Sequence, residues 1–264
     1  IGEVLVTAAE SKGSTSSSKI GREAIAHIQP SSIADLMELI PGGRATDPSF
    51  GAPQEIRLRE ADPSSSANYA TSALGTQIQV DGIPISNDAN LQYSTSYGSI
   101  QEYANVNRGV DTRAISTDDI ESVEIVRGIP SVEYGDLTSG VVKVKTRKGK
   151  TPYTATFTTN PKTKQFSLSK GFDLGRDLGS LNVAREHTRA IDNPVSPYTT
   201  YQRNGIALNY ARVFRRGSTP LNFSVGLTGN LGGMNTKDDP DAQTGEWKKA
   251  HDNALRFNTS LDWL

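Results

Sequence analysis

The side chains that most often carry out catalysis or hold metal ions are scattered along this sequence. The three histidines, His27, His187 and His251, lie far apart, and none falls within an H-E-x-x-H zinc pattern. The sequence also lacks a G-x-S-x-G nucleophile turn and a glycine-rich phosphate-binding loop. Because it contains no cysteine, it offers neither a disulfide framework nor a thiolate metal site. We therefore expect a protein that is not an enzyme, since no positive feature suggests a hydrolase.

Three aspartates come nearest to a metal-binding pattern. Asp238, Asp239 and Asp241 precede Gly245, as acidic residues precede glycine in some calcium loops. The stretch nevertheless lacks the glycine and the twelfth-position glutamate of the EF-hand spacing. We expect a solvated loop here, and the sequence predicts no metal and no cofactor.

Amides and aromatic rings alternate over residues 86–103, a composition that suits a small polar ligand. Amides can hydrogen-bond and tyrosines offer flat apolar faces, so sugars, peptides and metal chelates would be accommodated equally. The candidate ligand-binding residues are Asn87, Asn90, Gln92, Tyr93, Tyr97 and Tyr103. The alternative is a loop that is simply solvated.

The bulk composition excludes several classes of protein. Lys and Arg (28) nearly balance Asp and Glu (29) for a net charge of −1, so there is no bulk attraction to nucleic acid. The sequence contains neither an apolar run of about 18 residues nor a signal-peptide pattern. It begins at Ile1, so we expect a processed or trimmed chain. A mean hydropathy of −0.47 would suit a soluble protein, but membrane β-strands turn only alternate residues to lipid.

Up to about Lys150 the pattern mixes strands and short helices, which predicts an α+β domain. Residues 3–8 are strand-prone, and the serine-rich residues 11–19 should form a flexible linker. Residues 31–40 should form a helix capped by Ser31 or Ser32 and ended by Pro41-Gly42-Gly43. Further on we expect a strand with an Asp81-Gly82 turn over 77–84, a helical turn over 118–120, and strands over 122–126 and 141–146.

After Lys150 apolar and polar residues alternate with a period of two, which predicts about six strands. The clearest run places Leu221, Phe223, Val225 and Leu227 between small polar residues. Short turns over 171–179 and 215–220 alternate with longer polar connections over 186–200 and 232–252, as in outer-membrane barrels. A soluble β-sandwich also shows such alternation, so both architectures remain open at this point.

Four segments, in this order, resemble the plug of TonB-dependent outer-membrane transporters. Residues 3–8 resemble the TonB box, and residues 33–43 resemble the first plug helix with its terminating turn. Residues 79–84 are similar to the V-D-G-x-P strand, and I-E-S-V-E-I-V-R-G at 120–128 matches the longest signature of the family. The signature continues with Pro130, Ser131, Tyr134, Gly135, Gly140 and Val141. The resemblance covers residues 1 to about 148.

The resemblance implies an α+β plug domain followed by antiparallel transmembrane β-barrel strands. The expected domains are 1–19, a TonB-box-like segment and linker; 20–150, the plug; and 151–264, the first six or so barrel strands. The family's barrel has 22 strands, which need roughly 220 residues for the spanning segments alone. We therefore expect an incomplete barrel and a fragment of a longer protein.

Two sets of site residues follow from the resemblance. The TonB-binding residues would be Glu3, Val4, Leu5, Val6, Thr7 and Ala8, adding a strand to a sheet edge of TonB; otherwise they are the first plug strand. Plug arginines that pair with barrel glutamates in the family correspond to Arg127 and to Arg57 or Arg59. The I-R-G strand of the family appears here as I-R-L-R-E, so either arginine could fill the place; surface arginines are the alternative.

The function implied by the resemblance is TonB-dependent import of a scarce nutrient across the bacterial outer membrane, with the plug gating the barrel lumen. The expected partners are TonB, outer-membrane lipid and an unknown small ligand, with no nucleic acid. The alternative is a soluble or surface-attached β-rich ligand-binding protein or adhesin.

Overall fold

The computed structural model describes residues 6–10, 16–40, 54–58, 73–87, 109–128, 134–135, 137–175, 178–191, 193–195, 197–216, 219–238, 240–241 and 248–263. The chain divides into two compact units. The first comprises Ile1–Arg113 and Ile120–Lys145, and the second comprises Ala114–Asp119 and Thr146–Leu264. None of the helices within the described ranges is long and apolar enough to cross a membrane.

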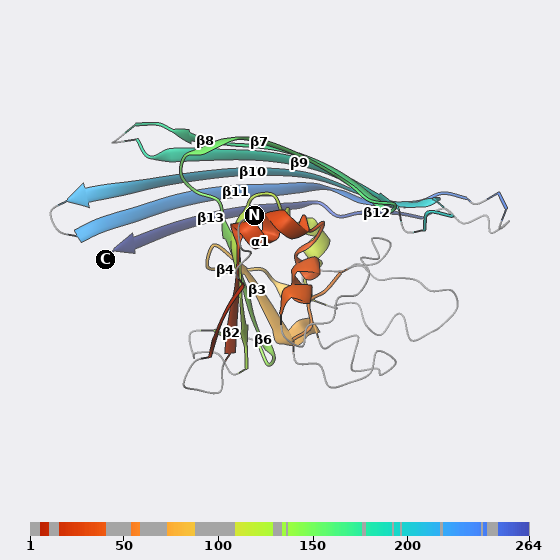
Figure 1. Cartoon of the computed structure of the whole chain (residues 1–264), viewed down its shortest axis with the longest axis horizontal. Helices are drawn as coiled ribbons and strands as arrows, with labels where there is room; N and C mark the ends of the chain where they lie inside the picture. The colour runs from red at the N-terminus through yellow and green to blue at the C-terminus, as the bar shows by residue number, and fades with distance from the viewer. Residues whose placement is uncertain are drawn as a thin grey trace. The chain divides into compact units, whose positions relative to one another are not determined.

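Six strands form the sheet of the first unit, in the order β1-β2-β5-β6-β3-β4. β2, β3, β4 and β6 are labelled in Figure 1. Pairing is antiparallel for β1–β2, β2–β5 and β3–β4, and parallel for β3–β6. The strands predicted over 77–84, 122–126 and 141–146 are all present. Their bounds are β1 Val6–Glu10, β2 Ser16–Gly21, β3 Thr76–Val80, β4 Ile83–Pro84, β5 Ile120–Arg127 and β6 Gly140–Thr146.

Part of the predicted linker is a strand. β2 lies between β1 and β5 in the sheet, and Ser18 and Ile20 are both 0% exposed. The linker prediction is therefore wrong for residues 16–19, while residues 11–15 lie outside the described part of the chain. Serine content misled the prediction because a serine can be buried in a strand when neighbouring strands supply the apolar contacts.

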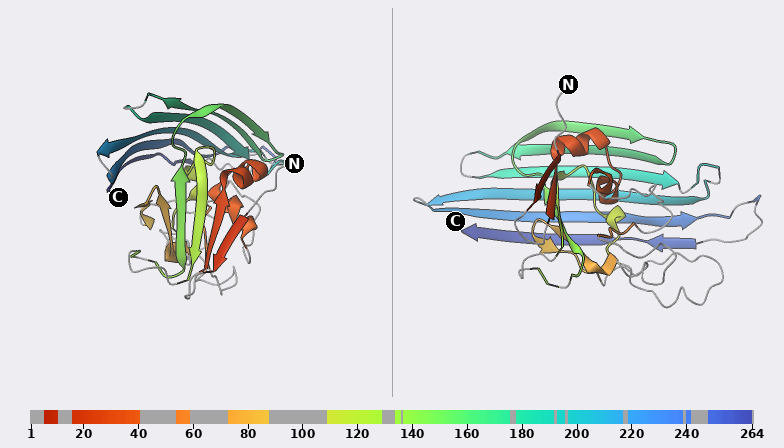
Figure 2. Two further views of the ribbon diagram at one scale, coloured as in Figure 1. Left: turned by 60° about the vertical axis from the view of Figure 1, so that its left-hand side comes forward. Right: turned by 60° about the horizontal axis from the view of Figure 1, so that its bottom comes forward.

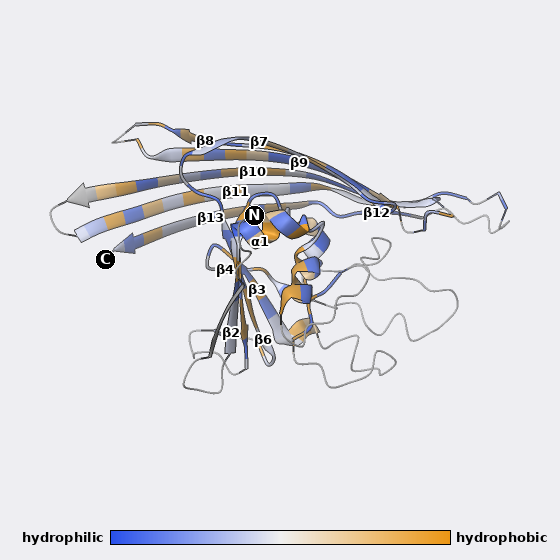
Figure 3. Cartoon of the chain, viewed as in Figure 1, coloured by the Kyte–Doolittle hydropathy of each residue, from blue (hydrophilic) through white to orange (hydrophobic). Residues whose placement is uncertain are grey.

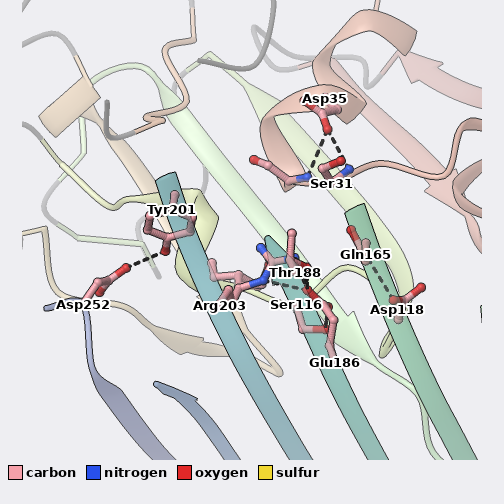
Figure 4. Close-up of polar contacts among 12 residues, drawn as sticks. Ser31, Asp35, Ser116, Asp118, Gln165, Glu186, Thr188, Tyr201, Arg203 and Asp252 are labelled. Carbon is pink, nitrogen blue, oxygen red and sulfur yellow. Dashed lines mark hydrogen bonds and ion pairs between the residues drawn. The ribbon is translucent and has the colours of Figure 1, made fainter. Parts of the chain in front are cut away.

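Short helices pack apolar side chains in the first unit. α1 spans Arg22–Ile28, and the sequence analysis did not predict it. The helix predicted over 31–40 exists as a 3-10 helix, η1, over Ile33–Leu39, and Ile33 and Leu36 are fully buried. Ser32 is its cap, because the Ser32 hydroxyl accepts from the Ala34 amide at 3.1 Å. The Asp35 carboxylate completes the capping box by accepting from the Ser31 and Ser32 amides at 2.8 and 3.0 Å (Figure 4).

Two further 3-10 turns follow in the chain, and one of them lies beside a buried polar cluster. η2 spans Ala73–Gly75 and η5 spans Thr112–Ala114. Beside η5, Arg113 pairs with Asp111, with 2.8 Å between Nη2 and Oδ2 and side chains 1% and 4% exposed. Asp111 also accepts from the Gln54 amide at 3.2 Å, and the Thr112 hydroxyl donates to the Gln54 carbonyl at 2.8 Å. These bonds fix residues 54–58 to the chain around η5.

Seven strands form the sheet of the second unit, in the order β12-β11-β10-β9-β8-β7 with β13 also beside β11. All neighbours are antiparallel, and the strands lie side by side in one curved sheet (Figure 2). β12 pairs with one end of β11 and β13 with the rest, so together they act as a sixth long strand, as the period-two pattern predicted. Bounds are β7 Thr151–Thr159, β8 Thr163–Asp173, β9 Ser180–Ile191, β10 Thr199–Arg216, β11 Thr219–Thr236, β12 Lys248–His251 and β13 Ala254–Trp263.

The strands extend further than the sequence pattern indicated. The connections predicted over 186–200 and 232–252 are too long, because β9 continues to Ile191 and β11 to Thr236. β10 and β11 are 18 residues each. Such lengths exceed the ~9–11 residues expected of a strand that crosses a bilayer.

Candidate functional site

The burial of the second sheet is the reverse of that in a soluble protein. Its buried face is lined mainly by polar side chains, and its exposed face carries large apolar ones. The alternation of polar and apolar residues along β10, β11 and β13 is visible as coloured bands in Figure 3. On the buried face lie Thr163, Gln165, Ser167, Ser169, Asn182, Glu186, Thr188, Arg203, Asn209 and Ser224. On the exposed face lie Tyr153, Phe157, Phe166, Leu168, Ile206, Leu231, Leu255, Phe257, Leu261 and Trp263. A membrane barrel has this pattern, because lipid bathes the outside and water the lumen.

An ion pair lies at the centre of the buried face. Glu186 on β9 and Arg203 on β10 have side chains 2% and 1% exposed. Arg203 Nε donates to Glu186 Oε1 at 2.7 Å, and Arg203 Nη2 donates to the same oxygen. The Thr188 hydroxyl donates to Glu186 Oε1 at 2.7 Å as well (Figure 4). The charges of both groups are therefore balanced within the sheet.

The segment Ala114–Asp119 is held against this buried face. The Ser116 hydroxyl donates to Glu186 Oε2, and Arg203 Nη1 donates to the Ile115 carbonyl at 3.3 Å. Gln165 on β8 donates to Asp118 at 2.9 Å, and Asn209 on β10 donates to Asp119 at 2.8 Å. Three neighbouring strands thus bind one short segment whose chain continues on both sides into the first unit.

A second polar contact joins strands farther along the sheet. The Tyr201 hydroxyl on β10 donates to the Asp252 carboxylate at 3.0 Å (Figure 4). Asn230 on β11 donates to the Asp252 carbonyl at 2.9 Å. Asp252 lies between β12 and β13, so these bonds secure the break between them.

The first unit coincides with a known domain. The family model described as "TonB-dependent Receptor Plug Domain" matches residues 9–142. The chain belongs to the TonB-dependent receptor plug domain family. The first unit is therefore the plug, and the resemblance that the sequence motifs indicated is confirmed.

Solved structures of TonB-dependent receptors share the fold of plug and sheet. The ferric enterobactin receptor PfeA of Pseudomonas aeruginosa, in complex with enterobactin, has a TM-score of 0.61 at 17% identity, covering 95% of this chain and 39% of PfeA. The siderophore receptor PirA of Acinetobacter baumannii has a TM-score of 0.56 at 17% identity, over 82% of this chain and 32% of PirA. PiuA of the same organism has a TM-score of 0.51 at 20% identity, over 83% and 27%. No curated protein matches the chain.

The chain spans less than two thirds of each of these receptors, at 39%, 32% and 27% of their lengths. The predicted fold class, a plug domain followed by antiparallel strands of an incomplete barrel, is confirmed. β7 and β12/β13 are the two edges of the sheet formed by the described residues.

Of the plug arginines predicted to contact the barrel, Arg57 and Arg127 lie in the described part. Arg57 Nη2 pairs with Glu55 within the plug at 3.1 Å, with side chains 16% and 7% exposed. Arg127 ends β5, opposite Ser16 of β2. Arg59 lies outside the described residues. Their pairing with barrel glutamates stays a prediction.

The predicted TonB-binding residues are only partly described. Val6, Thr7 and Ala8 lie in β1, opposite Ile20, Lys19 and Ser18 of β2. Glu3, Val4 and Leu5 lie outside the described residues. The structure thus places half of the predicted box in a plug strand, and its TonB-binding role stays a prediction.

Only one of the predicted ligand-binding residues is described. The Asn87 amide donates to the carbonyls of Leu74 and Thr76 at 3.2 and 3.5 Å, a contact that holds the chain after β4 against η2 and β3. Asn90, Gln92, Tyr93, Tyr97 and Tyr103 lie outside the described residues.

The remaining candidates for chemistry do not converge. His27 lies in the last turn of α1, His187 on the exposed face of β9 and His251 at the end of β12. His187 Nδ1 hydrogen-bonds Asn204 Oδ1 at 2.9 Å. Within the described ranges, no three His, Asp or Glu side chains gather as a metal site would require; Asp239 and Gly245 fall outside those ranges.

Sequence reasoning missed the Ser116–Glu186–Arg203 contact because it placed Glu186 at the start of a loop. One signal was available. Glu186 and Arg203 are opposite charges at inward-facing positions of consecutive strands, where a lone charge would be costly to bury.

Proposed function

We propose that the full-length protein imports a small nutrient across the bacterial outer membrane, energised by TonB, with the plug gating the barrel lumen. The observation that supports this most directly is the reversed burial of the second sheet, in a chain that carries a plug domain. Tyr153, Leu255 and Trp263 are 72%, 75% and 79% exposed, while Glu186 and Arg203 are buried. Lipid around a barrel would cover the apolar face, and the sheet would be part of a larger barrel.

The same observation disfavours the soluble binding protein or adhesin. A soluble sandwich buries its apolar face and exposes its polar one, whereas this sheet does the opposite. Large exposed apolar surfaces on soluble proteins cause aggregation.

An iron chelate is the first cargo that we would test. The solved relatives are siderophore receptors, and one of them holds enterobactin. Residues 86–103, the predicted ligand-binding stretch, offer amides and tyrosines to such a chelate, and the aromatic rings of that stretch support this choice.

β1 is the element that we propose TonB engages. It is the terminal strand in the sheet order and pairs on one side with β2 over Val6–Glu10. An edge strand offers backbone donors and acceptors to a partner strand, which is the usual mode of β-augmentation. Release of β1 from β2 would free the segment for pairing with TonB.

The strand order supports a route from β1 to the sheet of the second unit. β1 is joined to β2 by the polypeptide chain itself, β2 pairs with β5, and β5 begins at Ile120, directly after the segment Ala114–Asp119. Tension on β1 would therefore reach the hydrogen bonds of Ser116 with Glu186 and of Asp119 with Asn209. Breaking these bonds is the gating step that we propose.

Two disulfides that share one cysteine test this proposal. Thr7 lies opposite Lys19, and Lys19 lies opposite Glu124, so T7C/K19C would tether β1 to β2 and K19C/E124C would tether β2 to β5. Directly opposed residues fall in the Cα range of a disulfide, and the chain has no cysteine of its own.

The measurement is TonB-dependent uptake of the iron chelate by cells that express the full-length variants. Oxidised T7C/K19C should lose uptake to the level of cells without TonB, and a reductant should restore it. Oxidised K19C/E124C should retain uptake. Uptake by oxidised T7C/K19C at the control level would show that β1 does not leave β2 during transport.

A further inference from the structure

Among the residues that the structure describes, the exposed face of the second sheet carries cations and no carboxylates. In the described strands its charged side chains are Lys164, Lys170, Arg185, Arg189, Arg212 and Lys249, and every aspartate or glutamate of these strands points to the other face or lies at a strand end. A protein surface normally intersperses both signs of charge. The cations of the described strands therefore have no carboxylate on their own face to pair with.

The cations fall into two groups that differ in their neighbours and in their position along the strands. Lys170 and Arg212 lie toward the short turns, and each contacts aromatic rings. Lys170 Nζ is 4.4 Å from the centroid of the Tyr153 ring, and Arg212 Cζ is 4.3 Å from that of Phe214. These two cations are already accommodated by the π faces of their neighbours.

In the other group, Lys164 and Arg189 lie toward the long connections, which begin where β9 and β11 end, and Arg185 lies at the middle of β9. Arg185 and Arg189 on β9 and Lys164 on β8 are exposed, and within the described residues none of the three makes an ion pair or a ring contact. We refer to these three residues as the basic cluster. Lys249 on β12, opposite Asn235 of β11, lies on the same face at the same end of the strands.

Lys164 and Arg189 are direct register partners in the β8–β9 pair. Cβ atoms of directly opposed residues are about 4.5–5.5 Å apart, and like charges at that separation destabilise the pair. The arrangement becomes favourable once an anion lies between the two, because guanidinium and ammonium groups both bind phosphate.

The basic cluster borders the apolar band of the same face. In the register of the sheet, Arg185 lies opposite Leu168 and Ile206, and His187 lies opposite Phe166. Leu168, Ile206 and Phe166 are 47%, 44% and 50% exposed. A molecule bound here would place a charged group on the cations and an apolar group on the adjoining band.

We propose that this face binds the phosphate of a lipid headgroup on the basic cluster, with the acyl chains of the lipid lying on the apolar band. The inference rests on the proposed function, since it requires that the sheet faces a membrane. A lipid matches both halves of the surface, whereas a free phosphate ion matches only the cations. At the long-connection end, the lipid would belong to the outer leaflet of the membrane.

The test uses the full-length protein in a nonionic detergent and counts bound lipid by native mass spectrometry. The probe is dimyristoylphosphatidic acid, with dimyristoylphosphatidylcholine and inorganic phosphate as comparisons. K164Q/R189Q removes one lysine and one arginine from the basic cluster. K170Q/R212Q removes the same two residue types from the opposite end of the same face and is the matched control.

Wild type and K170Q/R212Q should bind phosphatidic acid with similar affinity, and K164Q/R189Q should bind it about thirtyfold more weakly. Phosphatidylcholine and inorganic phosphate should bind wild type at least about tenfold more weakly than phosphatidic acid does. Equal affinity of K164Q/R189Q and wild type would overturn the proposal. Inorganic phosphate binding as tightly as phosphatidic acid would replace it with a simple anion site.

Cell fractionation of the same variants separates this inference from the proposed function. A protein missing from the outer-membrane fraction would refute the proposed function whatever the lipid result. If the protein is in that fraction and K164Q/R189Q binds phosphatidic acid as wild type does, only the lipid site is refuted.

Discussion

Glu186 is a buried carboxylate whose donors come from three places in the chain. Thr188 belongs to its own strand, Arg203 to the neighbouring strand, and Ser116 to the segment Ala114–Asp119. An ion pair that is fully hydrogen-bonded contributes little net stability, because burying both charges offsets their attraction. Removing only one member of the ion pair is costly, because the charge of the other member stays buried without a partner.

Substitution of Arg203 by methionine should therefore destabilise the full-length protein by about 3–5 kcal/mol. The double variant E186M/R203M should recover most of that loss, because neither charge remains. The measurement is the temperature at which the folded, SDS-resistant form disappears on heating. A double variant as unstable as R203M would show that packing of the arginine stem, and not the charge, sets the cost.

Glu55 is the plug residue for which burial predicts a pH effect. Burial raises the pKa of Glu55 above its ordinary value of 4.5; the Arg57 charge and hydrogen bond lower the pKa, and the Asp111 charge raises it further. The folded plug thus favours the protonated carboxyl. The stability from this preference is complete below about pH 4.5 and is lost as the pH rises through the raised pKa.

The amide introduced by E55Q does not titrate, whereas the wild-type carboxyl loses its proton as the pH rises. E55Q should therefore gain stability relative to wild type as the pH rises to 7. Hydrogen exchange of the amides at Ile56 and Leu58 measures the free energy of local opening at each pH. A constant difference between E55Q and wild type would contradict the assignment.

At the scale of elements, the start of β6 depends on a close approach of two strands. A Cβ on Gly140 would collide with the Val126 carbonyl oxygen of β5 and with the Leu58 side chain. Gly135, in the same connection, has open space where its Cβ would lie. The sequence signature of the family includes both glycines, but only Gly140 is required by packing.

The G140A variant should destabilise the plug by about 1–3 kcal/mol, in line with overpacking of a tight site. G135A should change the stability by less than about 0.5 kcal/mol. Limited proteolysis of the plug in the full-length protein, as a function of urea concentration, would measure both. Equal resistance of the two variants would show that β5 and β6 can separate at no cost.

The period-two strands and the Asp81-Gly82 hairpin could be predicted because local pattern decides them. Asp81 and Gly82 have φ of 50° and 85°, the left-handed values that a tight hairpin turn needs. α1 escaped prediction because Gly21 provides no side-chain cap, so the helix lacks a start signal. η1 was predicted from its spacing of buried apolar residues, but spacing does not distinguish a 3-10 helix from an α-helix.

The candidate site was less predictable, because it depends on strand length and on contacts far apart in sequence. The polar outward residues His187 and Arg189 suggested a loop where β9 continues. Because the predicted strand stopped before Glu186, this residue could not be placed on the inward face of the sheet, near Arg203 on the next strand. No local signal marks Ser116 as the partner of a residue 70 positions away.

At the scale of the whole molecule, an open sheet predicts a larger assembly. β7 and β12/β13 have unpaired edges among the described residues, and lipid does not tolerate exposed backbone donors and acceptors. The native protein should therefore fractionate with the outer membrane and migrate faster in SDS before boiling than after it. A band near 28.4 kDa in the soluble fraction would contradict this prediction.

The segment Ala114–Asp119 also constrains the order of events during biogenesis. It leaves the ribosome before β8, β9 and β10, and its hydrogen-bond partners lie 47, 70 and 90 residues downstream. The Asp118 and Asp119 carboxylates cannot receive the Gln165 and Asn209 amides until those strands have paired. β5 and β6 come after this segment in the chain. These two strands are therefore connected to the earlier part of the plug through a segment whose contacts form late. A chaperone that keeps the chain unfolded until the strands assemble would therefore serve the plug as much as the barrel.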